Sequence, residues 1–326
     1  MLTVYAKDAL EGPIRRHDGP EAVAALAEAV WVDITSPKQE EVQAVQKALG
    51  IVVPAREQMQ EIETSSRLRR ESSAVYMTVT LLSNVSTPRP QCGAVTFILS
   101  HQRLVTLRYS DPLPFKIFGR TAETRDEVCK TGTAAMLGLF SAIIDRLADV
   151  IEMAGQDVEA ISHEVFRQAE VATGAQTYDG VIQRIGRTAD VVSKARESIM
   201  SLTRALTFLG ITAADMGAKK ELRNLLKNES RDLASISAYA DFVSDKISFL
   251  LDATLGMISQ QQNTIMKIFS VLAMVFLPPT LIGSIYGMNF QDMPELDWRF
   301  GYPMALALMV ISACLPYYFF KKKGWL

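Results

Sequence analysis

The chain has 326 residues and a formal net charge of −2, a length that allows one soluble domain and a small membrane part. Its 34 basic and 36 acidic residues are almost balanced, so nothing favours nucleic acid as a partner. The widely separated cysteines argue against a disulfide framework and a thiolate metal site: Cys92, Cys129 and Cys314. The sequence contains no nucleophile–base pair, P-loop or HExxH motif, and therefore does not predict an enzyme.

Residues 1–125 are predicted to form a mixed α/β domain in the cytoplasm. A helix is expected from Pro37 to Gly50, capped by Thr35 or Ser36. Short β-branched and apolar runs indicate strands at 4–6, 30–33, 73–82, 94–100 and 105–109. A basic run is interpreted as a solvated face, because the domain is not basic overall: Arg67, Arg69 and Arg70.

From residue 131 onwards the pattern is helical. Long amphipathic helices are predicted at 131–170 and 178–209, and a single helix at 213–289 that enters the bilayer. Acidic residues on the first of these helices either attract cations or form an ordinary solvated face, which we favour: Asp157, Glu159 and Glu164. The predicted organisation has three parts: an α/β domain at 1–125, a helical region with a stalk helix at 126–265, and a transmembrane domain at 266–326.

Two apolar stretches near the C-terminus predict membrane spans at about 268–287 and 301–320, joined by an extracytoplasmic loop at 289–300. Each is about 19 residues long, or roughly 28 Å as a helix, which is close to the hydrocarbon thickness. The loop is acidic: Asp292, Glu295 and Asp297. Because lysines lie at the other ends of both spans, at 267 and 321–323, both termini are expected in the cytoplasm. These lysines and the flanking aromatic residues argue against the alternative of a buried hairpin in a soluble protein.

A seam of mostly small and polar residues runs back from the end of the first span in alternating steps of three and four. It consists of Gly287, Ser284, Thr280, Leu277, Ala273, Ser270, Met266, Asn263, Ser259, Gly256 and Asp252. Such a seam permits tight helix packing, and polar residues in a membrane also line water-filled cavities. The spacing alone leaves packing and a pore equally open. A pore needs several copies of the chain, and in it Leu277 and Met266 would form apolar rings that close by dewetting.

The first span ends on Gly287, Met288 and Asn289. Mg²⁺ sheds its water reluctantly and prefers oxygen ligands in octahedral geometry. Neutral amide and carbonyl oxygens from Asn289 and Gly287 are therefore suited to hold the hydrated ion without trapping it. The acidic loop would raise the local cation concentration before the ions enter. These features favour Mg²⁺ as the cargo.

The run Tyr-Gly-Met-Asn-Phe at 286–290, followed by Met-Pro-Glu-Leu at 293–296, resembles the signature of the CorA family of magnesium and cobalt channels. The resemblance is strong over the C-terminal membrane region and extends only to layout elsewhere. It implies a funnel-shaped homopentamer in the cell inner membrane, with a stalk helix that continues into the first span. It also implies passive influx of Mg²⁺, with Co²⁺ and Ni²⁺ as lesser cargoes. In such channels cytoplasmic Mg²⁺ acts on acidic residues between subunits, and the sequence does not place those residues here.

By the same resemblance, the selectivity filter corresponds to Gly287, Met288 and Asn289, and the pore threonine and gate to Thr280 and Leu277. Further pore positions match Asn263, Met266 and Asp252. The loop after the Gly-Met-Asn motif resembles the magnesium type more than that of the family's zinc branch. A proton-coupled Zn²⁺ transporter on the same scaffold is therefore the alternative function, and a membrane-tethered helical scaffold without transport is a third.

Overall fold

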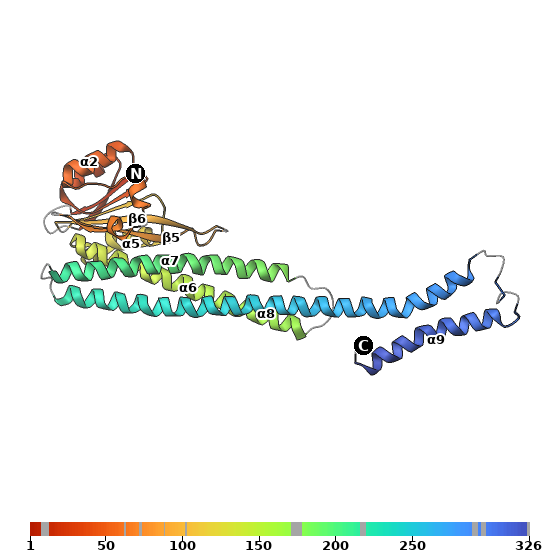
Figure 1. Cartoon of the computed structure of the whole chain (residues 1–326). Coiled ribbons are helices and arrows are strands. Elements are labelled where there is room, and N and C mark those ends of the chain that lie inside the picture. The colour runs from red at the N-terminus through yellow and green to blue at the C-terminus, as the bar shows by residue number, and fades with distance from the viewer. Residues whose placement is uncertain are drawn as a thin grey trace. The chain divides into compact units, whose positions relative to one another are not determined.

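The computed structural model describes residues 1–7, 13–61, 63–71, 74–87, 89–101, 103–170, 178–215, 220–288, 293–294 and 298–324. They fall into two compact units, Met1–Leu251 and Asp252–Leu326. The first unit contains a β-sheet with its covering helices, and the second contains two apolar helices (Figure 1).

The seven described strands form one sheet with the order β2-β1-β3-β7-β6-β5-β4. Their bounds are β1 (Leu2–Lys7), β2 (Ile14–Asp18), β3 (Ala29–Thr35), β4 (Leu68–Arg70), β5 (Ala74–Ser83), β6 (Gln91–Ser100) and β7 (Arg103–Arg108). Among these strands β3 and β7 form a parallel pair, and the other neighbours are antiparallel. Thr35 lies opposite Arg108 at the carboxyl end of the parallel pair.

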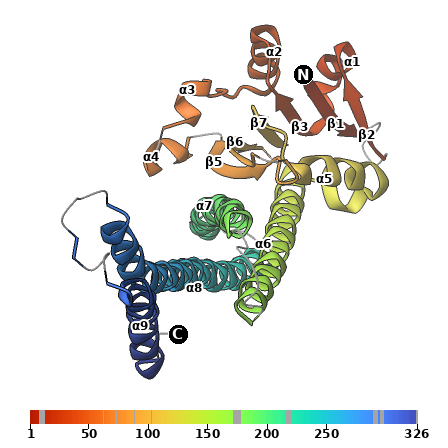
Figure 2. The same ribbon diagram turned by 90° about the vertical axis from the view of Figure 1, so that its right-hand side faces the viewer.

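Helices cover both faces of the sheet, which gives the first unit three layers (Figures 1 and 2). Helix α2 lies over one face, and α5, α6 and α7 lie under the other. The helices are α1 (Pro20–Ala24), α2 (Gln39–Leu49), α3 (Arg56–Met59), α4 (Thr64–Arg67), α5 (Leu113–Thr124), α6 (Gly132–Glu170), α7 (Asp179–Asp215) and the first part of α8 (Lys220–Tyr286), with 3₁₀ turns at Ala25–Glu28 and Asp126–Cys129.

Alternate side chains of β1, β3 and β7 enter two different cores, as the period of two in a strand requires. On the face under α2 the core is aliphatic and includes Val4, Val32, Val105 and Val45. On the face under α5 it is aromatic. The rings of Tyr5 and Trp31 stack with centroids 4.3 Å apart, and Phe118 of α5 lies 5.4 Å from Trp31.

The predicted strands are confirmed with ends that shift by at most three residues, but the helix expected from Pro37 to Gly50 begins later than predicted. This helix begins at Gln39, with Lys38 at the N-cap, so the expected cap by Thr35 or Ser36 was wrong. Thr35 still belongs to β3, and Ser36 has a φ of 43° while its N–H donates to the carbonyl of Arg108. Both residues are thus held by the sheet. Glu41 accepts a hydrogen bond from the Lys38 N–H instead.

The basic run at the edge of the sheet is more than a solvated face, which corrects its interpretation. Arg69 lies on β4, and its guanidinium carbon is 4.3 Å from the centroid of the Tyr76 ring. Arg67 donates to the hydroxyl of Thr80 at 3.1 Å and to the carbonyl of Glu61 at 2.6 Å. The contacts with Tyr76 and Thr80 join the short edge strand and the turn before it to β5.

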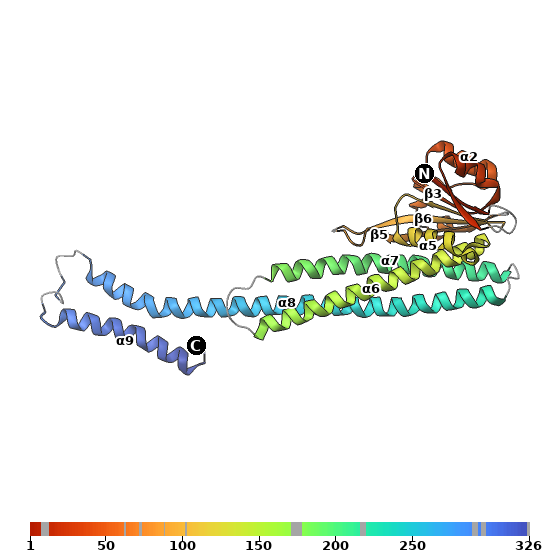
Figure 3. The ribbon, with the colours of Figure 1, turned by 180° about the vertical axis from the view of Figure 1, so that it is seen from behind.

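Three long helices are found as predicted, but α7 continues to Asp215, past its predicted end at 209, and α8 begins at Lys220 instead of at 213. Helices α6, α7 and the first part of α8 lie side by side in the first unit (Figure 3). Arg196 of α7 forms an ion pair with Asp241 of α8 at 2.7 Å. Ion pairs also engage two of the acidic residues that the sequence left open. Glu159 pairs with Lys246 of α8, and Glu164 pairs with Arg184 of α7. These contacts favour a structural role for both carboxylates.

The second unit pairs the last part of α8 with α9 (Gly301–Lys322). Both helices are long and apolar enough to cross a membrane. Only 6% and 11% of their most apolar stretches are buried, so neither is the core helix of a soluble protein. Apolar helices thus lie where the sequence predicted the two membrane spans, and their exposure argues against the buried hairpin.

A close helix–strand approach in the first unit gives a test of the packing. A Cβ added at Gly119 of α5 would overlap the Oη of Tyr5, which is 5% exposed and stacked on Trp31. Gly119→Ala should therefore lower the free energy of unfolding by about 1–3 kcal/mol through overpacking. Gly186→Ala in α7, where the added Cβ meets open space, should raise it by up to about 1 kcal/mol. Thermal unfolding followed by circular dichroism measures both, and equal effects would contradict the close approach.

Candidate functional site

The predicted seam lies along one side of α8. All of its residues belong to the described part of this helix or follow it directly, and each is exposed in the single chain. Leu277 and Met266, the expected apolar rings, are 66% and 67% exposed. Asp252, at the inner end of the seam, is the first residue of the second unit. Since an α-helix has 3.6 residues per turn, the 3–4 spacing keeps these positions on one face.

The opposite side of α8 is the covered side. Its buried and half-buried residues are Val271, Val275, Pro278, Pro279, Ile282 and Tyr286, and on an ideal helix they centre roughly 180° from the seam. A Cβ on Gly283 would lie 3.5 Å from the Cε of Met309 in α9. The buried and half-buried residues of α9 likewise recur on one side: Gly301, Met304, Ala305, Met309, Ser312, Ala313, Pro316 and Phe320. Helix α9 thus packs on the side of α8 that faces away from the seam.

The hydroxyls of the seam present oxygen lone pairs. Thr280 Oγ1 donates its proton to the carbonyl of Phe276 at 2.6 Å, and Ser270 Oγ donates to the carbonyl of Met266 at 2.8 Å. A hydroxyl whose proton is used in this way can still accept through its oxygen, and so can contact a hydrated cation. The seam therefore carries acceptors without carrying charge inside the span.

Two prolines lie inside α8 next to the apolar ring position at Leu277, and the helix continues through both. Because proline has no N–H, Pro278 and Pro279 leave two carbonyls of the preceding turn without their helical donors. Backbone hydrogen bonding is therefore looser in mid-span at these two positions.

Helix α8 ends at the predicted filter. The N–H of Gly287 donates to the carbonyl of Gly283 at 2.9 Å, and the N–H of Met288 donates to the carbonyl of Ile285 at 3.3 Å. A Cβ on Gly287 would lie 3.0 Å from the Gly283 carbonyl oxygen, so this turn is tight. The remaining predicted residues of the mouth lie outside the described residues: Asn289, Asp292, Glu295 and Asp297.

Carboxylates of α6 and α8 influence one another in the first unit. Burial is the main cause that raises the pKa of Asp145, and the nearby carboxylates of Asp149 and Asp232 raise it further. Burial is also the main cause that raises the pKa of Glu229. A hydrogen bond with Ser141 lowers this pKa, and the carboxylates of Asp232 and Asp145 raise it. In the described ranges of one chain, no group of three or more His, Cys, Asp or Glu side chains is arranged to hold a metal ion. These carboxylates therefore repel one another without forming a metal cage.

Comparison with known proteins adds sequence and structural relatives. Residues 27–322 match a family model described as CorA-like Mg²⁺ transporter protein. The Magnesium transport protein CorA of Pasteurella multocida (strain Pm70) is 34% identical over 304 residues, covering 93% of this chain and 94% of that one. The protein of the same name from Yersinia pseudotuberculosis serotype I (strain IP32953) is 35% identical over 302 residues, covering 92% and 93%.

A solved structure, the complete CorA magnesium transporter from Methanocaldococcus jannaschii, matches with a TM-score of 0.76 and 17% sequence identity. The match covers 100% of this chain and 99% of that one. At this identity the likeness supports the shared fold alone: an α/β sheet domain, a long helix and two C-terminal apolar helices.

Proposed function

The chain belongs to the family of CorA-like Mg²⁺ transporter proteins, a family of membrane transporters, and on that premise we propose that it is a passive channel for Mg²⁺ influx. Co²⁺ is proposed as an alternative cargo, with Ni²⁺ as a further one. The proposal depends most on the seam of α8, which presents neutral oxygen acceptors on the side that α9 leaves uncovered.

Several copies of the chain are needed to enclose a conduit, because one chain supplies two membrane helices. We propose a homopentamer in which the seam of each α8 faces the symmetry axis and α9 lies outside. Hydroxyls would then line the pore at Ser270, Thr280 and Ser284, and apolar rings would form at Leu277 and Met266. Asn263 and Asp252 would extend the pore toward the cytoplasm.

The filter is proposed at Gly287, Met288 and Asn289, where α8 ends in a tight turn at Gly287. A ring of amide and carbonyl oxygens would bind Mg²⁺ through its first water shell, since stripping this shell is costly. The acidic loop residues would gather cations outside: Asp292, Glu295 and Asp297. We propose that both termini lie in the cytoplasm and that the protein resides in the inner membrane.

Cytoplasmic Mg²⁺ is proposed to gate the channel by favouring a closed ring. The repelling carboxylates Asp145, Glu229 and Asp232 are consistent with this idea, because a nearby divalent cation would relieve their repulsion. The full regulatory site is not assigned, and we propose that it is shared between subunits.

Asn289→Ala should reduce Mg²⁺ uptake into proteoliposomes to background, because it removes the amide oxygens of the proposed ring. Assembly should persist by size-exclusion chromatography. Ser312→Ala on α9 is the control, since the Ser312 hydroxyl donates to the Met309 carbonyl of its own helix and lies off the seam. An Asn289→Ala protein with wild-type flux would refute the filter assignment, and an assembled wild type without flux would favour a scaffold.

A proton-coupled Zn²⁺ transporter predicts a different response to a pH gradient. Uptake of Mg²⁺ and Zn²⁺ is compared in proteoliposomes with and without an imposed gradient at equal ionic strength. For a passive channel we expect Mg²⁺ flux to change little, because no proton is moved with the ion. A flux of Zn²⁺ that requires the gradient, with little Mg²⁺ flux, would favour the alternative.

Gating by cytoplasmic Mg²⁺ predicts that the metal protects the first unit from proteolysis. Limited digestion of the full chain in detergent is compared with and without Mg²⁺, with Na⁺ added to match the ionic strength. Mg²⁺ should slow cleavage severalfold in the wild type, and less so in the double variant Asp145→Asn/Glu229→Gln. Identical digestion patterns in the wild type would argue against metal-linked closure.

A further inference from the structure

A pocket of about 440 Å³ with several charged lining residues lies at the carboxyl ends of the parallel strands β3 and β7, near the start of α5. The size falls within the usual range for small-molecule sites. Its charged lining residues are Arg16, Asp33, Arg108, Asp111, Lys116 and Arg120. In open sheets the carboxyl ends of parallel strands are where ligands usually bind. None of these residues has a role in the proposed ion pathway.

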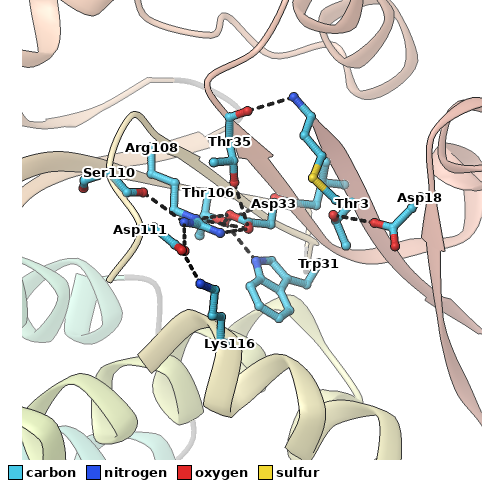
Figure 4. A network of polar contacts seen from close by, with 12 residues as sticks. Thr3, Asp18, Trp31, Asp33, Thr35, Thr106, Arg108, Ser110, Asp111 and Lys116 are labelled. Atoms are coloured by element: carbon cyan, nitrogen blue, oxygen red, sulfur yellow. Dashed lines mark hydrogen bonds and ion pairs between the residues drawn. The ribbon is translucent and has the colours of Figure 1, made fainter. Parts of the chain in front are cut away.

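The wall of the pocket contains a fixed cation, Arg108 (Figure 4). The residue is 7% exposed, and its guanidinium contacts Asp33, Asp111 and the carbonyl of Ser110, each at 2.9 Å. Burial opposes its charge, but Asp33 and Asp111 more than compensate and raise the pKa of Arg108. Arg108 therefore stays charged, and it forms ion pairs with both carboxylates of the lining.

Three further cations lie around this wall with greater freedom. Lys116 pairs with Asp111, and Arg16 pairs with Asp18 at 3.0 Å. Arg120 has no ion-pair partner in the part of the chain that the structure describes. Four basic side chains thus line the pocket against two acidic ones, and Asp18 beside Arg16 lowers the excess to one positive charge. A lining with a positive excess attracts an anion.

The position of α5 directs two of these cations to the pocket. Lys116 and Arg120 are four residues apart, so they share one face of the helix. Between them, Gly119 has no side chain and allows the helix to lie against Tyr5 of β1. The same glycine that sets the packing of this unit therefore brings both basic side chains to the pocket.

We propose that this pocket binds a small anion that carries a phosphate chain. Lysine and arginine side chains on several sides suit a group whose charge is spread over many oxygens, and the arginine fork matches phosphate geometry. A single carboxylate offers only two oxygens and one negative charge, fewer acceptors than basic side chains on several sides can bind. Such a site would make the first unit responsive to a phosphorylated metabolite as well as to a metal ion.

Binding is tested directly by isothermal titration calorimetry on the full chain in detergent. Tripolyphosphate is the probe, and EDTA is present so that metal chelation does not contribute. We expect saturable binding to the wild type and about tenfold or more weaker binding to Lys116→Gln/Arg120→Gln. The control Arg204→Gln/Lys227→Gln, which removes the same charge from exposed sites on α7 and α8, should bind like the wild type.

Two further ligands, ATP and succinate, show which part of the anion the pocket recognises. Tighter binding of ATP than of tripolyphosphate would indicate a nucleotide, and equal binding would indicate recognition of the phosphate chain alone. Succinate, a dianion without phosphate, should bind much more weakly than either. The proposal is overturned if neither phosphate compound binds the wild type, if succinate binds equally well, or if both double variants lose affinity to the same extent. None of these outcomes depends on transport.

Discussion

Within a bilayer every backbone N–H and C=O must find its partner inside the protein, and this constraint shapes the whole membrane part of the molecule. Helix α8 meets it over its apolar stretch with its own hydrogen bonds, so it can carry one uninterrupted seam from Asp252 to the turn at Gly287. The constraint is relaxed where Pro278 and Pro279 remove two donors, and again where the helix ends. Both places coincide with proposed functional positions, next to Leu277 and at the filter.

The first unit handles charge in a different way. A membrane filter of neutral dipoles can hold a cation and release it, whereas the sheet buries a charged guanidinium between two carboxylates at 2.9 Å. Breaking such a buried pair would leave an uncompensated charge, which typically costs about 3–5 kcal/mol. The pair at Asp33 and Arg108 therefore holds the carboxyl ends of β3 and β7 in one arrangement, around which more mobile cations gather.

The sequence predicted the features that have a clear period or a long apolar run. The strands at Val4 and Val32 and the three long helices were found because their apolar residues recur regularly. Strand β2 was missed because it contains one buried apolar residue, Ile14. The pocket was missed because its cations come from separate elements that only the fold brings together. For the seam, the spacing identified its residues, but only the packing of α9 showed which side of α8 is uncovered.

The one-sided contact between the two apolar helices restricts which substitutions α9 can tolerate. On α9, side-chain size is restricted at buried positions such as Ala305, where a larger side chain has little free space. At the exposed positions Val310, Ile311 and Leu315 side-chain size is not restricted, and only apolar character needs to be kept. Substitutions should therefore accumulate on the exposed side of α9. On its buried side they should be rarer, and a change in side-chain size there should be accompanied by an opposite change on α8.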